Sequence, residues 1–128
     1  MIVDSSAVIA ILLREPGYEA LVEKLAASPA SGIGAPTLAE AAIVMTSRTR
    51  RDAAPMVALF AREAGLAVVP FGDAHWRAAV AAYLRFGKGR HRAALNFGDC
   101  MSYATAKLAD QPLLCVGQDF GRTDLRLA

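Results

Sequence analysis

The sequence has few of the residues that form disulfide and metal–thiolate sites. Its 128 residues include two cysteines and two histidines. Cys100 and Cys115 do not form a C-x-x-C pair, and neither histidine flanks them at the spacing of a zinc site. We therefore predict two buried, reduced thiols in a cytoplasmic protein, rather than a disulfide framework or a zinc centre.

Long apolar runs are also missing. The longest clean run, Ala7–Leu13, is far too short to cross a bilayer. The N-terminus has no basic region and reaches Asp4 almost at once, so we expect neither a signal peptide nor a membrane partner. Hydrophobic residues make up 55% of the chain, which excludes a disordered protein and favours one globular domain over residues 1–128.

The net charge is small, and it says little about partners. Fourteen basic and twelve acidic residues leave a formal charge of +2. The basic residues are unevenly placed: one cluster lies between Arg85 and Arg92, and a second one joins Arg48, Arg50 and Arg51. Such a cluster can bind phosphates, or it can be an ordinary solvated loop or helix end.

Short β-like runs alternate with helical patterns along the whole chain. The expected strands are Ile2–Val3, 32–36, Leu66–Phe71 and Leu113–Val116, with a short last strand at Leu125–Leu127. The expected helices are 5–13, 18–27, 37–48, 52–63, 74–86 and 100–109. This alternation predicts an α/β fold, a three-layer α/β/α sandwich around a mainly parallel sheet of four to five strands.

Two local patterns refine these helices. Thr37 and Glu40 match the S/T-x-x-E capping box, which predicts that a helix begins at Thr37. In the helix expected over residues 74–86, the larger apolar side chains define the face that should be buried. That face consists of Trp76, Ala79, Val80 and Tyr83.

Four carboxylates occupy strand ends or helix starts. They are Asp4, Glu40, Asp99 and Asp119. Each one alone is explained by helix capping or a tight turn, because acids are favoured at helix N-termini. In a parallel sheet, however, these positions share one edge, so we expect the four side chains to converge in one crevice.

Converging carboxylates would be explained by a cation. They repel one another unless a positive charge neutralises them, and ligands that are all oxygen select Mg²⁺ or Mn²⁺. Such ions bind phosphate oxygens and activate water for attack on phosphorus. Acids for a metal and a basic loop for a polyanion together predict a nuclease.

The motifs resemble those of the PIN-domain ribonucleases, and within them the VapC-type toxins of bacterial toxin–antitoxin pairs. The opening Ile2–Ala7 is similar to the first motif of that family, and Thr37–Glu40 is similar to its second acidic motif. The stretch from Tyr83 to Cys100 resembles its most specific segment, and Gly117–Phe120 with Thr123-Asp124 resembles its C-terminal motif.

This resemblance implies a PIN-like, metal-dependent endoribonuclease with one or two Mg²⁺ or Mn²⁺ ions on the four acids. It also implies a homodimer and a cognate VapB-type antitoxin that blocks the site. Supporting roles around the acids fall to Ser6, Asn96, Thr123 and Asp124, and RNA contacts to Lys88, Arg90, His91 and Arg92.

Other readings of the first motif fit less well. A phosphatase of the haloacid-dehalogenase type needs a second aspartate where Ser6 stands. A metal-dependent adhesion domain, a binding module with the pattern D-x-S-x-S, needs a serine where Val8 stands. A receiver domain needs paired acids near its start and a lysine after its last strands, and neither pattern is present in the sequence. A catalytically inactive PIN-like protein is the remaining alternative that is not an enzyme.

Overall fold

The computed structural model describes residues 1–128 and contains one sheet with helices on both faces. The strands are β1 (Ile2–Val3), β2 (Ser31–Gly34), β3 (Leu66–Val69) and β4 (Leu113–Leu114). The α-helices are α1 (Ser5–Leu12), α2 (Tyr18–Ala27), α3 (Ala35–Thr49), α4 (Ala54–Glu63), α5 (Asp73–Phe86) and α6 (Phe97–Ala109), and a 3₁₀ turn spans Phe120–Arg122.

The sheet is parallel throughout, and its strand order is β3-β2-β1-β4. Central β1 pairs with β2 through Ile2 and Gly32, and with β4 through Ile2 and Leu113. The predicted α/β sandwich with a parallel sheet is thus confirmed, with four strands. The segment at Leu125–Leu127 adds one isolated bridge, between Leu127 and Leu113, instead of a fifth strand.

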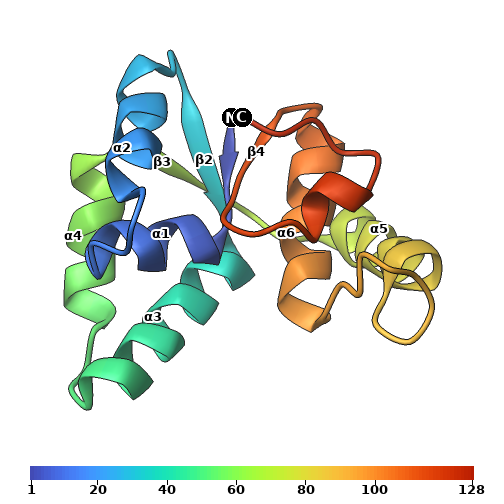
Figure 1. Cartoon of the computed structure of the whole chain (residues 1–128), viewed down its shortest axis with the longest axis horizontal. Helices are drawn as coiled ribbons and strands as arrows, with labels where there is room; N and C mark the ends of the chain where they lie inside the picture. The colour runs from blue at the N-terminus through green and yellow to red at the C-terminus, as the bar shows by residue number, and fades with distance from the viewer.

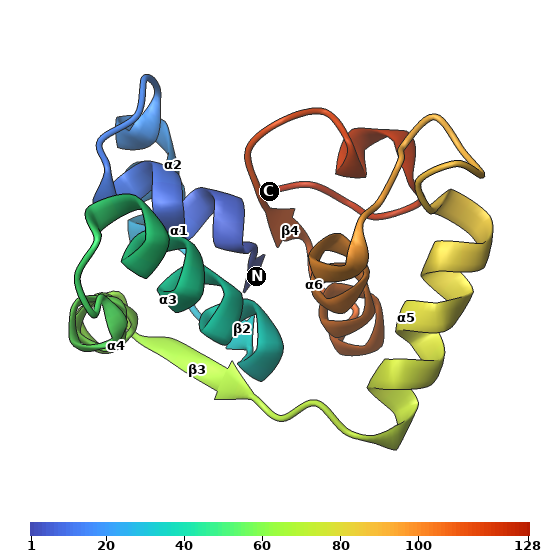
Figure 2. The ribbon, with the colours of Figure 1, turned by 90° about the horizontal axis from the view of Figure 1, so that it is seen from below.

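Two hydrophobic cores make the fold three-layered. Because neighbouring strand residues point to opposite faces, Ile2 packs in the core under α5 and α6, whereas Val3 packs in the core under α1 to α4. Leu113 and Leu114 divide between the same two cores. Figure 2 shows α1 to α4 on one side of the sheet and α5 and α6 on the other.

The carboxyl ends of the strands gather the helix starts. In Figure 1 the strands run away from the two labelled termini, and α1, α3 and α6 meet around their far ends. A parallel sheet places ligand sites at this edge. The element order therefore positions three helix N-termini around the end of β1.

Helix α3 begins earlier than the capping-box pattern predicts. Its first residue is Ala35, its N-cap is Gly34, and Pro36 lies in the first turn, where a missing N–H costs nothing. Thr37 therefore lies inside the helix and is fully buried, so the predicted helix start at Thr37 is wrong. Its hydroxyl is free to bond across to another element, and the Glu40 side chain is not needed as a cap.

Helix α5 buries a different face from the predicted one. Ala79 is buried, but Trp76, Val80 and Tyr83 are about half exposed. The face that packs against α6 includes Ala79, Ala82 and Phe86. Small side chains let two helices approach closely, and this close contact takes precedence over burying the bulkier residues.

The two cysteines are both free thiols, as predicted, and only Cys100 is fully buried; Cys115, just after β4, is half-buried.

The predicted helix over 52–63 starts two residues later, and Asp52 instead accepts a hydrogen bond from the Ala54 N–H at 3.0 Å. Among the helices, none combines the length and apolar character required to span a membrane.

Candidate active site

Asp4 is the most constrained of the four acids. It follows β1, caps α1 and is only 3% exposed. Its Oδ2 accepts hydrogen bonds from the Ser6 N–H at 3.0 Å and the Ser6 hydroxyl at 2.5 Å, and its Oδ1 accepts one from the Ser102 hydroxyl at 2.5 Å. Three donors thus hold one buried carboxylate in a single orientation.

Glu40 reaches across from α3 to the start of α6. Its carboxylate lies so close to Gly98 that a Cβ at position 98 would overlap it, so a side chain there would displace the Glu40 carboxylate. Burial raises the pKa of Glu40 above its ordinary value; the Ser5 side chain opposes this shift and the charge of Asp4 adds to it. Glu40 therefore approaches both Asp4 and the N-terminus of α6.

Asp99 lies in the first turn of α6 in a reciprocal cap with Asn96. The Asn96 N–H donates to Asp99 Oδ2 at 2.8 Å, and the Asp99 N–H donates to Asn96 Oδ1 at 2.9 Å. Burial, together with the charges of Asp4, Asp119 and Glu40, raises the pKa of Asp99 to about 6, although the backbone hydrogen bond from Asn96 lowers it. Asp99 is thus within electrostatic range of the other three acids.

Asp119 occupies the open side of this group. It is exposed, precedes the 3₁₀ turn and makes no side-chain cap. Its charge raises the pKa of both Asp99 and Cys115. The structure therefore brings all four predicted acids into one electronegative region.

The acids nevertheless do not form a ready-made coordination shell. No three Asp, Glu, His or Cys side chains are placed to surround a metal ion. The donors are chemically suited to a hard divalent ion, because they are all carboxylates and none of them forms a salt bridge. Asp4 is fixed by its hydrogen bonds, so the longer Glu40 and the exposed Asp119 are the side chains with freedom to turn inward.

Two hydroxyl-bearing residues beside Asp4 were missed by the sequence reasoning. Ser102 of α6 donates to Asp4, and Thr37 of α3 lies 3.1 Å from the Ser102 hydroxyl. Both are buried. Ser102 lies in a run of small helix residues that predicts only close packing, so its sequence context carries no signal of this role. Gly98 likewise stands out in the sequence only as part of a motif.

Of the remaining predicted supporting residues, Ser6 contacts an acid of the site, whereas Thr123 and Asp124 bond elsewhere. Ser6 bonds Asp4 directly and accepts a hydrogen bond from the Val116 N–H at 3.0 Å, so it joins the start of α1 to the segment that follows β4. Thr123 bonds Phe120 O and closes the 3₁₀ turn. Asp124 is not brought to the acids; it accepts hydrogen bonds from Tyr103, Arg85 and Lys107.

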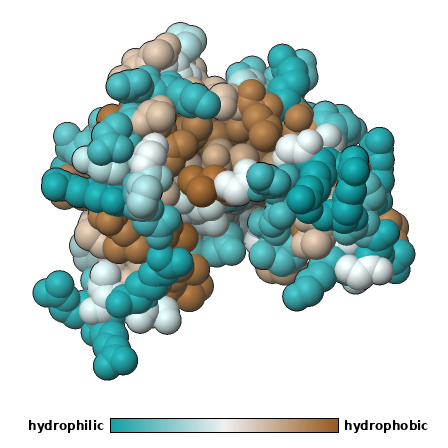
Figure 3. Space-filling view, in the orientation of Figure 1, coloured by the Kyte–Doolittle hydropathy of each residue, from teal (hydrophilic) through white to brown (hydrophobic).

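The basic loop between α5 and α6 presents three of its four predicted RNA contacts to solvent. Lys88, Arg90 and Arg92 are exposed. His91 is half-buried, packs its ring edge-on against Phe86 and accepts a hydrogen bond from the Ala93 N–H. In the orientation of Figure 3, the side of the molecule that carries this loop is mostly hydrophilic. His91 thus organises the loop that displays the cations.

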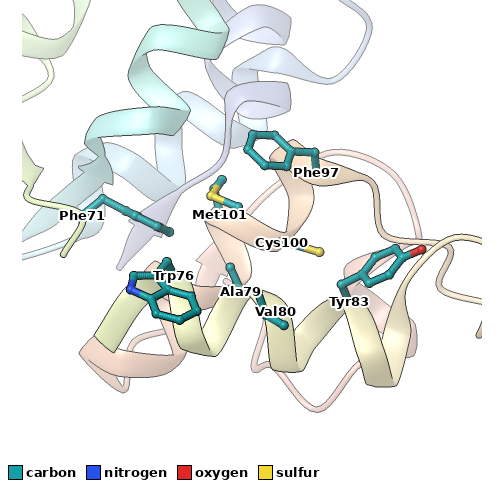
Figure 4. A pocket seen from close by; sticks show the side chains of 8 residues that line it. All are labelled: Phe71, Trp76, Ala79, Val80, Tyr83, Phe97, Cys100 and Met101. Atoms are coloured by element: carbon teal, nitrogen blue, oxygen red, sulfur yellow. The ribbon is translucent and has the colours of Figure 1, made fainter. Parts of the chain in front are cut away.

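An apolar groove of about 560 Å³ lies between α5 and α6. The half-exposed apolar side chains of α5 form part of its lining. Every lining residue is hydrophobic; they are Phe71, Trp76, Ala79, Val80, Tyr83, Phe97, Cys100 and Met101. Figure 4 shows Phe71 and Trp76 at one end, Tyr83 at the other and Phe97 projecting from the start of α6. Phe97 is 81% exposed and lies two residues before Asp99.

Comparisons with known proteins agree with this geometry. The PIN domain family matches residues 1–125. Ribonuclease VapC36 of Mycobacterium tuberculosis is 51% identical over 126 residues, which cover 98% of this chain and 91% of that protein.

Solved structures show the same fold at low sequence identity. The crystal structure of Mycobacterium tuberculosis VapC20, described as a sarcin-ricin loop cleaving toxin, superposes with a TM-score of 0.79 at 16% identity and covers 99% of this chain and 97% of its own. A toxin–antitoxin complex from Klebsiella pneumoniae superposes with a TM-score of 0.71 at 18% identity, covering 99% and 95%. The chain therefore belongs to the PIN domain family and, within it, to the VapC ribonucleases.

Proposed function

We propose that this VapC ribonuclease is an endoribonuclease toxin whose acidic site works with one or two Mg²⁺ or Mn²⁺ ions. The proposed ligands and catalytic residues are Asp4, Glu40, Asp99 and Asp119. The observation that carries the proposal is Asp99, whose pKa is raised to about 6 by burial beside three other acids. A site that costs this much electrostatic energy without a cation is suited to bind one.

The acidic side chains have different proposed roles around the metal ion. A bound Mg²⁺ or Mn²⁺ would supply an activated water and neutralise charge on the scissile phosphate. Asp4 provides the fixed point, because its three hydrogen bonds prevent it from turning away. Glu40 and Asp99 meet at the N-terminus of α6, where the helix dipole helps to hold negative charge.

Cleavage of RNA by the purified, antitoxin-free protein tests this proposal. A single-stranded RNA should be cut with Mg²⁺ or Mn²⁺, and EDTA should stop the reaction. Added Mg²⁺ in excess of the chelator should restore it. Cleavage that continues undiminished in EDTA would exclude the metal mechanism, and absence of cleavage with either ion would favour the inactive, PIN-like alternative.

The basic loop is proposed as the RNA backbone contact. Lys88→Ala combined with Arg92→Ala removes two exposed cations and should weaken RNA binding by about tenfold at low salt. The slope of log K against log salt should flatten by about 1.4, because each phosphate contact on a single strand contributes roughly 0.7. Fluorescence anisotropy over a salt series measures both.

Arg50→Ala combined with Arg51→Ala is the matched control for the basic-loop variant. Both arginines are exposed, and they lie just past the C-terminus of α3, away from the helix starts that form the site. An equal loss of RNA binding in this control would show that overall charge, and not the loop, holds the RNA.

The proposed protein partner is a VapB-type antitoxin that blocks the site. The Klebsiella pneumoniae relative by fold is a toxin–antitoxin complex, and a ribonuclease that cleaves cellular RNA must be held inactive in the cell that makes it. Co-expression with the product of a neighbouring small open reading frame should suppress both growth arrest and RNA cleavage. Unchanged cleavage by the purified pair would contradict this partner.

A second copy of the chain is the proposed occupant of the apolar groove between α5 and α6. Monomers rarely leave so many large apolar side chains together in solvent. The hollow and the projecting Phe97 lie on the same face, and a two-fold interface needs a knob and a hole on one self-complementary surface.

Oligomeric state tests this assignment. Light scattering coupled to size exclusion should give twice the chain mass for the wild type. Val80→Arg places a charge in the groove and should yield a monomer, whereas Val22→Arg, at a similarly exposed valine of α2, should stay dimeric. A monomeric wild type, or a dimeric Val80→Arg variant, would contradict the assignment.

A further inference from the structure

Two hydroxyl groups lie buried where α3 and α6 cross the end of β1. Ser102 is fully buried, Thr37 is 1% exposed, and Asp4 beside them is 3% exposed. The Ser102 hydroxyl lies 2.5 Å from Asp4 Oδ1 and 3.1 Å from the Thr37 hydroxyl. A core that needed only packing would not place two hydroxyls here, because a buried hydroxyl without a partner costs stability.

The protons of this chain of hydroxyls have one possible order. A carboxylate oxygen accepts, and Ser102 has a single hydroxyl proton, which it donates to Asp4 Oδ1. Ser102 can then only accept from Thr37. The order is therefore Thr37 to Ser102 to Asp4, and each hydrogen bond polarises and strengthens the next.

A second chain ends on the other oxygen of the same carboxylate. The Val116 N–H donates to the Ser6 hydroxyl at 3.0 Å, and that hydroxyl donates to Asp4 Oδ2, which also accepts from the Ser6 N–H. An ionised carboxylate offers about four lone-pair directions. Two are used on Oδ2 and one on Oδ1, so a single direction on Oδ1 is left.

We propose that Thr37 and Ser102 are positioning residues that fix the Asp4 carboxylate so that it presents one lone pair, on Oδ1, to the metal. This inference rests on the proposed metal-dependent function. It predicts that Asp4 binds through one oxygen, and that the orientation comes from α3 and α6 as well as from the adjacent Ser6. Partners that orient a metal ligand typically change metal affinity by about 10- to 100-fold when they are removed.

Another hydroxyl of α6 shows what a purely structural role looks like. Thr105 is also buried, one turn further along α6, but its hydroxyl bonds the Met101 carbonyl of its own helix at 2.9 Å. It makes no contact with an acid. Thr37→Val and Thr105→Val therefore remove the same group from equally buried sites. Only Thr37→Val breaks the hydrogen-bond chain that leads through Ser102 to Asp4.

Calorimetric titration of Mn²⁺ into the full-length, metal-free protein is the test. Ser102→Ala should weaken Mn²⁺ binding by about tenfold or more, and Thr37→Val by a smaller factor. Thr105→Val should bind like the wild type, and Thr37→Ser, which keeps the hydroxyl, should restore affinity. A crystal structure of metal-free Ser102→Ala should show the Asp4 carboxylate rotated from its wild-type orientation.

The outcomes separate this inference from the proposed function. Wild-type Mn²⁺ binding that survives Ser102→Ala, with Asp4 unmoved, overturns the positioning role and leaves the metal site standing. Equal losses in Thr37→Val and Thr105→Val also overturn it, because general destabilisation would then explain both. A wild type that binds no Mn²⁺ contradicts the proposed function and this inference together.

Discussion

Replacing Asp99 with asparagine should abolish RNA cleavage, by about 10³-fold or more, and at the same time stabilise the metal-free protein. The lost carboxylate removes a proposed metal ligand. Stability rises because the ionised Asp99 is half-buried beside three other acids, which raises its pKa to about 6. Asparagine keeps an oxygen for the hydrogen bond from the Asn96 N–H. After allowance for solvent exposure, we expect a gain of about 1–2 kcal/mol at pH 8.

The pH dependence of this gain has a defined sign. A pKa that is raised in the folded state contributes stability below the unfolded pKa, near 4, and that contribution is lost as the pH rises through about 6. The advantage of Asp99→Asn should therefore grow between pH 4 and 6 and level off above pH 7. Urea unfolding in EDTA measures it.

Asp52→Asn serves as the control for charge removal at a helix start. Asp52 also bonds a backbone N–H at the beginning of a helix, but it is exposed and lies on the α3–α4 connection, away from the acids. It should change neither cleavage nor the pH dependence of stability. A gain in this control equal to that of Asp99→Asn would show that the effect does not come from the acidic site.

Replacing Asp4 with alanine should also abolish cleavage, but with the opposite effect on stability. Its carboxylate satisfies three donors in a nearly solvent-free position, and alanine would remove the acceptor of the Ser102 hydroxyl and of the Ser6 N–H. It would also remove the cap of α1. We expect the free energy of unfolding to fall by about 2–4 kcal/mol.

Asp52→Ala measures the loss of a single side-chain hydrogen bond to a backbone N–H at a helix start. Asp52 and Asp4 each accept from the backbone N–H two residues later, but Asp52 makes no buried hydroxyl contacts. Its loss should be about 1 kcal/mol or less. If Asp4→Ala were no more destabilising than Asp52→Ala in urea unfolding, the buried hydrogen bonds around Asp4 would contribute nothing measurable to the free energy of unfolding.

The layers of the fold follow from sequence patterns, whereas the buried face of α5 does not. Alternating strand and helix signals predict the sandwich, because each element must bury one face. In α5 the larger side chains Trp76 and Val80 helped to define the predicted face, yet of the predicted residues only Ala79 is buried, beside Ala82. The choice depends on how closely α6 approaches, and the periodicity of one helix carries no information about its neighbour.

The acidic site follows from topology, but the side chains that orient it do not. Asp4, Glu40 and Asp99 are predictable because strand ends and helix starts of a parallel sheet meet at one edge. Ser102 bonds a residue 98 positions away in the sequence, and serine in a helix of small residues indicates nothing more than packing. Asp124 shows the converse: it follows Asp119 closely, but the intervening 3₁₀ turn directs it towards Tyr103.

The central claim is that the four acids form one divalent-metal site, and calorimetric titration of Mn²⁺ into the metal-free wild type and Asp99→Asn tests it most directly. The wild type should bind, with release of about half a proton at pH 6 and almost none at pH 8, because Asp99 is half-protonated near pH 6. Asp99→Asn should bind far more weakly and release fewer protons than the wild type at pH 6. Undiminished Mn²⁺ binding by Asp99→Asn, or no binding by the wild type, would contradict the claim.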